Sequence, residues 1–199
     1  MTIEAARTPT IAECDELAYL MHYGATDKAG APYIEHPRRV ARFLAPHGQW
    51  AVLAGLLHDI VEDTPATLEG LADRGYPPQV VQAVDAVTRR PEETDYLDVI
   101  RRAAADPLGS LVKLADNLDN SHPARLAKLG KYEAARLRNK YAPARDLLEA
   151  AVREHDERAG IAPFTAVYGP PVGDDFHALA LRRLPPQEPS IVRALGQRG

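Results

Sequence analysis

The chain has 199 residues, of which 45% are hydrophobic, and a formal net charge of −4. This length is enough for one substantial hydrophobic core, and the negative charge excludes a general attraction to DNA, RNA or an anionic membrane. The single cysteine, Cys14, excludes an internal disulfide and a thiolate zinc cage, and no apolar run reaches the ~18 residues of a membrane span, so we expect a cytoplasmic protein without a membrane partner.

The first two predicted helices are marked by residues typical of helix ends. Thr10 is a candidate N-cap for a helix over residues 10–24, and Gly24 is a candidate stop. Pro37 is a candidate first residue of the second helix, which ends near Gly48. Both segments carry apolar residues at helical spacing, which predicts that each packs one face against a core.

A third helix is predicted over residues 49–63, QWAVLAGLLHDIVED, which is apolar on nearly all sides. This pattern is typical of a central helix surrounded by others. The same helix carries four polar groups, His58, Asp59, Glu62 and Asp63. Because buried carboxylates are costly unless they are paired, hydrogen-bonded or bound to a metal, the segment predicts a bound cation or a reaction.

Helical periodicity continues through the rest of the first 160 residues. The segments, in chain order, are TLEGLADRG, PPQVVQAVDAVTRR, DYLDVIRRAAAD, GSLVKLADNLDN and KYEAARLRNKYAPARDLLEAAVREHDERAG. This part of the sequence has no convincing alternating strand pattern and no internal repeat. We therefore predict an all-α fold, a helical bundle, with residues 1–160 as one domain.

Residues 161–199 form a proline-rich C-terminal extension that holds six of the 17 prolines. Only DDFHALALRRL in it has a helical pattern, and FTAVY is either a short strand or an extended arm. We expect the extension to pack on the domain or on a partner subunit of a homo-oligomer, with a mobile end.

Two histidines and two aspartates from separated segments form a candidate metal site. They are His36, the adjacent pair His58 and Asp59, and Asp116 in LVKLADNLDN. Two imidazoles with two carboxylates suit Mn²⁺, Fe²⁺, Zn²⁺ or Co²⁺ better than Ca²⁺. An adjacent pair can straddle one ion, since neighbouring helical side chains diverge by about 100°. Each element alone is weak evidence, because a single histidine on an apolar face is more often a core residue.

The segments YIEHP, LLHDIVEDT and VKLADNLDN resemble, in order and approximate spacing, those of the HD-domain metal phosphohydrolases. The resemblance runs roughly from Leu17 to Leu148 and looks most like the hydrolase domain of RelA/SpoT-type alarmone enzymes and their small single-domain relatives. It implies an all-helical domain that binds one divalent metal, usually Mn²⁺, and removes pyrophosphate from the 3′ position of guanosine tetra- or pentaphosphate. Carried over to this sequence, it makes the metal ligands His36, His58, Asp59 and Asp116.

The resemblance also implies roles for other residues. Glu62 and Asp63 match the acidic pair that positions or deprotonates the attacking water, and the alternative is an exposed last helical turn, where acidic side chains oppose the helix dipole. Asn120 matches an asparagine that contacts the nucleotide, and its alternative is a helix C-cap. Lys28 and Arg125 are candidate phosphate contacts, although most charges in a basic run form a solvated face.

Two departures from the family pattern concern the substrate. Asp27 stands where alarmone hydrolases usually carry an arginine that stacks on guanine, and Asn120-Ser121-His122 replaces Asn-Met-Arg. Three interpretations are therefore open: a Mn²⁺-dependent pyrophosphohydrolase acting on a guanosine 3′-pyrophosphate, a phosphomonoesterase acting on another nucleotide or nucleotide cofactor, and a catalytically idle metal or nucleotide sensor. The presence of Glu62 and Asp63 argues against the idle sensor, since a pure binder needs no base.

Overall fold

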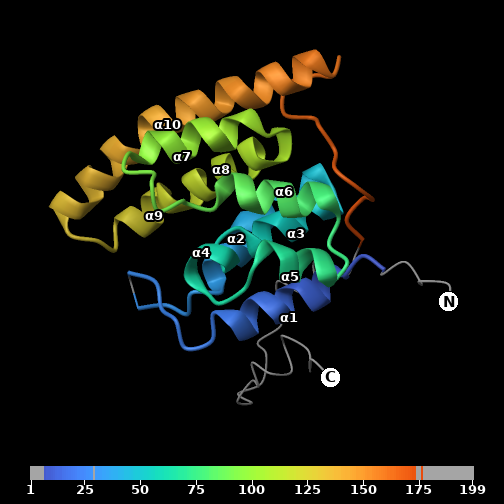
Figure 1. Cartoon of the computed structure of the whole chain (residues 1–199). Coiled ribbons are helices and arrows are strands. Elements are labelled where there is room, and N and C mark those ends of the chain that lie inside the picture. The colour runs from blue at the N-terminus through green and yellow to red at the C-terminus, as the bar shows by residue number, and fades with distance from the viewer. Residues whose placement is uncertain (1–6, 29, 174–175, 177–199) are drawn as a thin grey trace, which may run out of the picture.

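The computed structural model describes residues 7–28, 30–173 and 176, and Figure 1 shows that they form a helical bundle. Within these residues the single β-bridge joins Thr26 and Pro32, and no strand forms, so the predicted all-α class is confirmed. No helix in this part of the chain is both long and apolar enough to cross a membrane. The elements are α1 (Ile11–Met21), α2 (Glu35–Leu44), the 3₁₀ helix η1 (Ala45–His47), α3 (Gln49–Leu57), α4 (Ile60–Asp63), α5 (Leu68–Asp73), α6 (Pro78–Val87), α7 (Tyr96–Ala105), α8 (Pro107–Asn120), α9 (Pro123–Leu126) and α10 (Lys131–Arg158).

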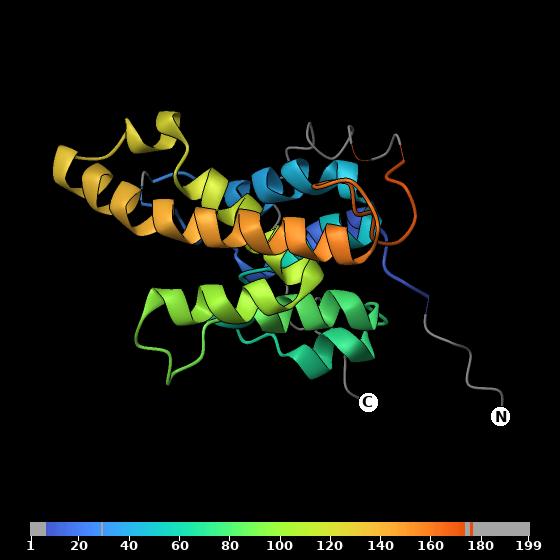
Figure 2. The ribbon, with the colours of Figure 1, turned by 90° about the horizontal axis from the view of Figure 1, so that it is seen from above.

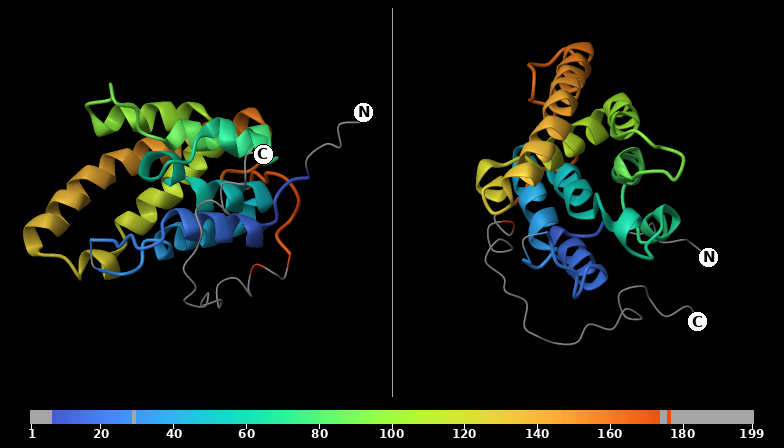
Figure 3. Two further views of the ribbon diagram at one scale, coloured as in Figure 1. Left: turned by 60° about the horizontal axis from the view of Figure 1, so that its bottom comes forward. Right: turned by 90° about the vertical axis from the view of Figure 1, so that its left-hand side faces the viewer.

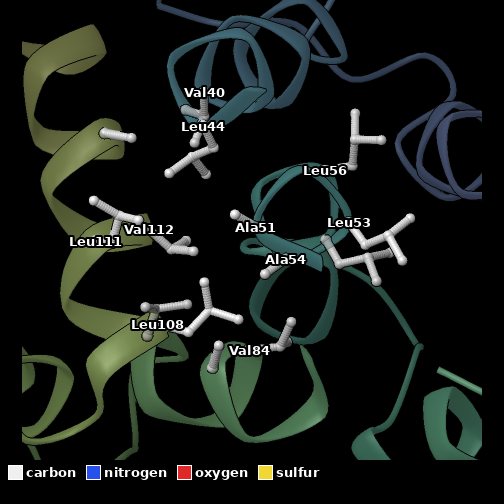
Figure 4. Close-up of a cluster of buried hydrophobic side chains, with 14 of the residues drawn as sticks. Val40, Leu44, Ala51, Leu53, Ala54, Leu56, Val84, Leu108, Leu111 and Val112 are labelled. Carbon is white, nitrogen blue, oxygen red and sulfur yellow. The ribbon is translucent and has the colours of Figure 1, made fainter. Parts of the chain in front are cut away.

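Helix α3 lies at the centre of the bundle, as its apolar pattern predicted. Every residue from Ala51 to Leu57 is buried, and α1, α2, α6 and α8 all pack against this helix. Figure 4 shows side chains from α2, α3, α6 and α8 pointing toward one another. Helix α10 runs along one side of the bundle, opposite α1 (Figure 1), and packs on α7 and α8 (Figure 2). The packing on all sides fixes the end of α3, where His58 follows.

The predicted third helix is interrupted at His58 and Asp59, which corrects the expectation of one continuous helix over residues 49–63. α3 ends at Leu57, and α4 begins at Ile60. The backbone of Asp59, with φ −101° and ψ −3°, departs from regular helical values. Because of this turn the two side chains meet, with Asp59 Oδ2 only 3.0 Å from His58 Nε2, whereas neighbours in a regular helix diverge by about 100°.

Helix α2 begins at Glu35, two residues before the proline at which we predicted its start. Pro37 is tolerated there because the first amides of a helix have no partner within it. Gly55 of α3 packs so closely on α2 that a Cβ atom at this position would lie 3.1 Å from the Cα atom of Ala41. This close approach brings His36 of α2 next to the end of α3.

Residues 161–173 form an extended arm, so the strand alternative for FTAVY is wrong. The amides of Gln49 and Trp50 donate hydrogen bonds to the carbonyls of Pro170 (2.7 Å) and Tyr168 (3.1 Å), and the Tyr168 amide donates to the carbonyl of His47 (2.8 Å). The arm therefore covers the first turn of α3 (Figure 3). The helix predicted for DDFHALALRRL lies outside the described residues except for one position.

Candidate active site

The four predicted metal ligands come together at the C-terminal end of α3. The Nε2 atoms of His36 and His58 are 3.2 Å apart. Asp59 Oδ2 lies 3.0 Å from the Nε2 atom of His58 and 3.6 Å from that of His36. Asp116 Oδ1, from α8, lies 3.3 Å from His36 Nε2 and 3.8 Å from His58 Nε2. The fold thus gathers two imidazoles and two carboxylates around one point.

The outer nitrogens of both imidazoles already have hydrogen-bond partners. His58 Nδ1 lies 2.8 Å from the carbonyl oxygen of Gly55, and His36 Nδ1 lies 2.7 Å from Oδ2 of Asp119. Both of these oxygens are acceptors. Arg125 Nη1 also lies 3.1 Å from His36 Nδ1, but it donates to Asp119 Oδ2, which is the nearer neighbour of that nitrogen. We therefore assign the hydrogen to each Nδ1, so that each neutral ring presents its lone pair at Nε2. Two lone pairs facing each other at this distance require a proton or a cation between them. The donor set therefore fits a divalent metal ion.

The charges at the cluster agree with this fit. Burial by itself would lower the pKa of His36, but hydrogen bonds to Asp116 and a second aspartate raise this pKa to about 9. Without a cation His36 therefore carries the proton that the two facing nitrogens require, and a bound metal ion would replace this proton. Burial by itself would raise the pKa of both ligand carboxyls, but His58 holds the pKa of Asp59 below its usual value, and Lys113 does the same for Asp116. Both aspartates are consequently ionised at neutral pH, as metal ligands must be.

Three further side chains orient the two carboxylates. The hydroxyl of Tyr33 donates a hydrogen bond of 2.5 Å to Asp59 Oδ2. Lys113 Nζ lies 2.9 Å from Asp116 Oδ2, and Asn120 Nδ2 donates to Asp116 Oδ1. Asn120 therefore lies on the same face of α8 as Asp116, as predicted. The C-cap alternative for Asn120 is wrong, because the cap is the residue that follows it.

A cavity of about 460 Å³ opens over the cluster. All the predicted site residues line it except His58, which is buried behind it. A cavity of this size suits a nucleotide-sized ligand, and its basic side chains suit phosphate groups. These basic side chains are Lys28, Arg39, Arg89, Lys113, Arg125, Lys128 and Lys140.

Glu62 and Asp63 lie beside the cluster of histidines and aspartates. Both are exposed in the last turn of α4, and both line the cavity. Glu62 Oε2 accepts a hydrogen bond of 3.0 Å from the backbone amide of Arg89, which ties α4 to the loop after α6. The group whose potential ligand atoms all lie within 4.8 Å of one another is His36, His58 and Asp59. Glu62 and Asp63 lie outside this group, as does Asp116, whose Oδ1 nevertheless lies within 3.8 Å of both Nε2 atoms.

The two predicted basic contacts of the substrate have acidic neighbours. Lys28 Nζ lies 3.4 Å from Glu133 Oε1. Arg125 forms an ion pair with Asp119, and its Nη2 atom lies 3.9 Å from Oδ2 of Asp27. Asp27 also accepts a hydrogen bond of 3.0 Å from a backbone amide of its own loop, at residue 31. This wall of the cavity is therefore less positive than its lysines and arginines alone would make it.

Four side chains that contact the predicted ligands or their partners were absent from the predicted set: Tyr33, Arg39, Lys113 and Asp119. Positions three apart on a helix share a face. That spacing links Arg39 to His36, and it links both Lys113 and Asp119 to Asp116, so a signal for these three was present in the sequence. Tyr33 lies in the loop before α2, where helical spacing gives no guide.

Comparison with known protein families identifies the family to which this chain belongs. The model of the HD domain family matches residues 14–143, which include all four predicted ligands. The chain belongs to the HD-domain family. The family resemblance predicted from the three motifs is thereby confirmed. The HD-domain assignment also agrees with the helical bundle and with the histidine and aspartate cluster at its centre.

Curated relatives of this HD domain are longer bacterial proteins. The GTP pyrophosphokinase of Streptomyces coelicolor is 36% identical over 141 residues, which are 66% of this chain and 16% of that protein. The guanosine-3′,5′-bis(diphosphate) 3′-pyrophosphohydrolase of Aquifex aeolicus is 38% identical over 114 residues, 53% of this chain and 16% of that protein. This chain therefore corresponds to a small part of each relative.

A solved structure is similar over most of its own length. It is described as a metazoan ortholog of SpoT that hydrolyzes ppGpp. The match has a TM-score of 0.54 and 27% sequence identity, and it covers 75% of this chain and 98% of that chain. Nearly the whole of that chain is therefore matched by part of this one.

Proposed function

We propose that this HD-domain chain is a metal-dependent pyrophosphohydrolase that removes pyrophosphate from the 3′ position of guanosine 3′,5′-bis(diphosphate) or a closely related nucleotide. The convergence of His36, His58, Asp59 and Asp116 at the floor of a basic cavity carries this proposal. The relative from Aquifex aeolicus, named for the same reaction, supports the substrate class. Mn²⁺ is the proposed cation, because a mixed set of imidazole and carboxylate ligands suits it.

The residues around the cluster have separate chemical tasks in this proposal. His36, His58, Asp59 and Asp116 would hold a divalent cation, which would lower the pKa of a water molecule and offset the negative charge of the attacked phosphate. Glu62 and Asp63, beside the cluster, orient the water and accept its proton. Tyr33 and Lys113 hold the two ligand carboxylates in place through their hydrogen bond and ion pair.

The basic lining supplies the contacts for the phosphate groups. Guanidinium and ammonium groups form charge-assisted hydrogen bonds with phosphate oxygens. Lys140 is half-buried above the ring of Tyr96, with Nζ 4.0 Å from the ring centroid, and burial lowers the pKa of its ammonium. A phosphate beside it would reverse this effect, because a negative charge favours the protonated amine. We therefore propose Lys140 and Arg125 as phosphate contacts.

Asp27 favours a second candidate, a phosphomonoesterase acting on another nucleotide or nucleotide cofactor. Its side chain lines the cavity and faces Arg125, so the loop that carries an arginine in alarmone hydrolases presents a carboxylate here. A carboxylate offers no planar cation to stack on guanine and repels phosphate. Losing a stacking contact costs about 1 to 3 kcal/mol per base, so weak preference for guanine over adenine is expected.

A panel of nucleotides with Mn²⁺ tests both candidates. Release of pyrophosphate from guanosine 3′,5′-bis(diphosphate), absent in Asp59→Ala, supports the proposed function. The ratio of kcat/KM for guanosine and adenosine 3′-pyrophosphates tests the base preference, and a strong preference for guanine would show that another residue reads the base. Release of phosphate alone from other nucleotides would establish the second candidate instead. No turnover of any nucleotide with Mn²⁺, Zn²⁺, Co²⁺ or Fe²⁺ would refute both.

Two properties of the whole protein accompany this proposal. A cytoplasmic location suits a nucleotide substrate and the buried free thiol of Cys14. Self-association into a homo-oligomer is testable by size-exclusion chromatography with light scattering, and a constant monomer mass at all concentrations would exclude it.

A further inference from the structure

Asp119 touches a predicted metal ligand and two arginines of the cavity wall at the same time. Its Oδ2 atom lies 2.7 Å from His36 Nδ1. Arg39 donates to both oxygens, with Nε 2.7 Å from Oδ1 and Nη2 3.1 Å from Oδ2. Arg125 Nη1 donates to Oδ2 and also lies 3.1 Å from His36 Nδ1. The side chain of Asp119 is only 4% exposed, whereas those of Arg39 and Arg125 are 31% and 25% exposed. One buried carboxylate thus connects the cluster to the wall.

We propose that Asp119 is a positioning residue for His36, and that the two arginines weaken its effect. The inference rests on the metal site of the proposed function. By accepting the Nδ1 hydrogen, the carboxylate holds the imidazole in the tautomer and orientation in which Nε2 faces Asp59 and Asp116. A carboxylate behind a ligating histidine also raises the basicity of the nitrogen that binds the metal, and its removal typically costs ten- to a hundredfold in metal affinity.

The arginines act in the opposite direction. Their positive charges, within hydrogen-bond distance of Asp119, withdraw part of its negative charge from His36 and lie near the cation site. The negative charges of Asp119 and of the two ligand aspartates raise the basicity of His36 and favour a bound cation. The positive charge of Arg39 repels a cation and so lowers the metal affinity of the site. Removal of the Asp119 carboxylate should therefore weaken metal binding, whereas removal of the Arg39 guanidinium should strengthen it.

Metal affinity separates this role from a merely structural one. We expect calorimetry with Mn²⁺ to show a ten- to a hundredfold weaker affinity for Asp119→Ala, with Asp119→Asn in between because its amide oxygen still accepts a hydrogen bond. Arg39→Gln is expected to bind Mn²⁺ about two- to fivefold more tightly. If Asp119 served only to hold α8 against α2, Asp119→Ala and Arg39→Gln would both bind Mn²⁺ more weakly, and that result would overturn the proposal.

A matched control and a second readout complete the experiment. Asp15 is as buried as Asp119 and accepts hydrogen bonds of 2.8 and 2.7 Å from Arg38, which lies on α2 as His36 does, but it does not contact a histidine in the described part of the chain. Asp15→Ala should therefore lose stability but keep its Mn²⁺ affinity. In Zn²⁺-loaded protein, the downfield NMR signal of the His36 Nδ1 hydrogen should disappear in Asp119→Ala and persist in Asp15→Ala. Unchanged metal affinity in Asp119→Ala would refute the positioning role, even if the wild-type protein is an active hydrolase. If the wild-type protein shows no hydrolytic activity but Asp119→Ala still binds the metal more weakly, only the proposed function is refuted.

Discussion

The Nζ atom of Lys113 lies 2.9 Å from Oδ2 of Asp116 at the floor of the cavity, where the two side chains are 10% and 6% exposed. Burial by itself would lower the pKa of Lys113, but attraction to Asp116 raises it, so the ammonium group stays charged. The other oxygen of Asp116 faces His36. Asp116 consequently has a cationic partner on one side and the cluster on the other.

Replacement of this lysine should destabilise the metal-free protein more than the metal-loaded one. Lys113→Met leaves the carboxylate of Asp116 buried without its cation, which costs about 3 to 5 kcal/mol of unfolding free energy. Bound Mn²⁺ supplies positive charge to the same carboxylate, so urea denaturation with Mn²⁺ should show a smaller loss. Lys128→Met, at an exposed position, is the control. An equal loss with and without Mn²⁺ would contradict the placement of the cation beside Asp116.

Loss of a ligand carboxylate should remove the metal. Because Asp59 and Asp116 approach the two imidazoles from different elements, we expect either Asp59→Ala or Asp116→Ala to abolish stoichiometric binding. Elemental analysis should find about one transition metal per wild-type chain and none in these variants. Asp98→Ala, whose side chain is 47% exposed and pairs only with a surface arginine, should keep its metal. Full metal content in both ligand variants would refute the assignment.

Glu62→Gln should separate metal binding from turnover. The amide oxygen of glutamine still accepts a hydrogen bond from the Arg89 amide, so the end of α4 stays in place. An amide is no base, and loss of general base catalysis typically costs about 10² to 10⁴ in rate. We expect unchanged metal content with kcat reduced by this factor, and Glu69→Gln, on the exposed face of α5, as active as wild type. Loss of metal together with activity would instead make Glu62 a ligand.

The ion pair between Glu93 and Arg102 should make stability depend on acid pH. Arg102 Nε lies 2.7 Å from Glu93 Oε1 and lowers the pKa of that carboxyl to about 2, from a usual value of 4.5. The folded protein therefore holds this proton less tightly than the unfolded chain does. The resulting stability is fully present above pH ~4.5 and is lost as the pH falls toward 2.

Urea denaturation of Glu93→Gln measures this contribution. At pH 7 the variant should lose about 1.5 to 3 kcal/mol, the range for hydrogen bonds to charged groups. The difference from wild type should shrink steadily as the pH falls from ~4.5 toward 2, because the unfolded wild-type chain takes up the proton in this range whereas the folded protein does so only near pH 2. Glu92→Gln, at an exposed position, should change little. A difference that is independent of pH would mean that packing, not charge, accounts for the loss.

Hydrophobic periodicity was sufficient to predict the bundle and its central helix. A helix that is apolar all round, such as residues 51–57, can only be stable when other helices surround it, so its pattern determines its place. The break at His58 and Asp59 left no such mark, because both residues are compatible with a helix and the turn depends on what their side chains meet. The short helix α9 was also missed, since four residues carry no periodic signal.

The candidate site was predicted as far as its motifs extended. His36, His58, Asp59 and Asp116 were brought together by resemblance to a family, and the fold then placed both aspartates within a few ångströms of the two imidazoles. The partners of these residues are harder to predict from sequence. An aspartate at helical spacing from a ligand, such as Asp119, has the same pattern as an ordinary solvent-exposed aspartate. Burial distinguishes them, and burial is known only once the helices are packed.

The arm over the start of α3 links parts of the chain that leave the ribosome at different times. His47 Nδ1 lies 3.0 Å from the carbonyl of Ala166, 119 positions later in the chain, and the amides of Gln49 and Trp50 depend on carbonyls nearby in the same arm. At 5 to 20 residues per second, synthesis of the intervening chain takes on the order of ten seconds. During this interval the first amides of the helix that precedes His58 are open to water, so the N-terminal turn of this helix is completed only after the arm has been synthesised.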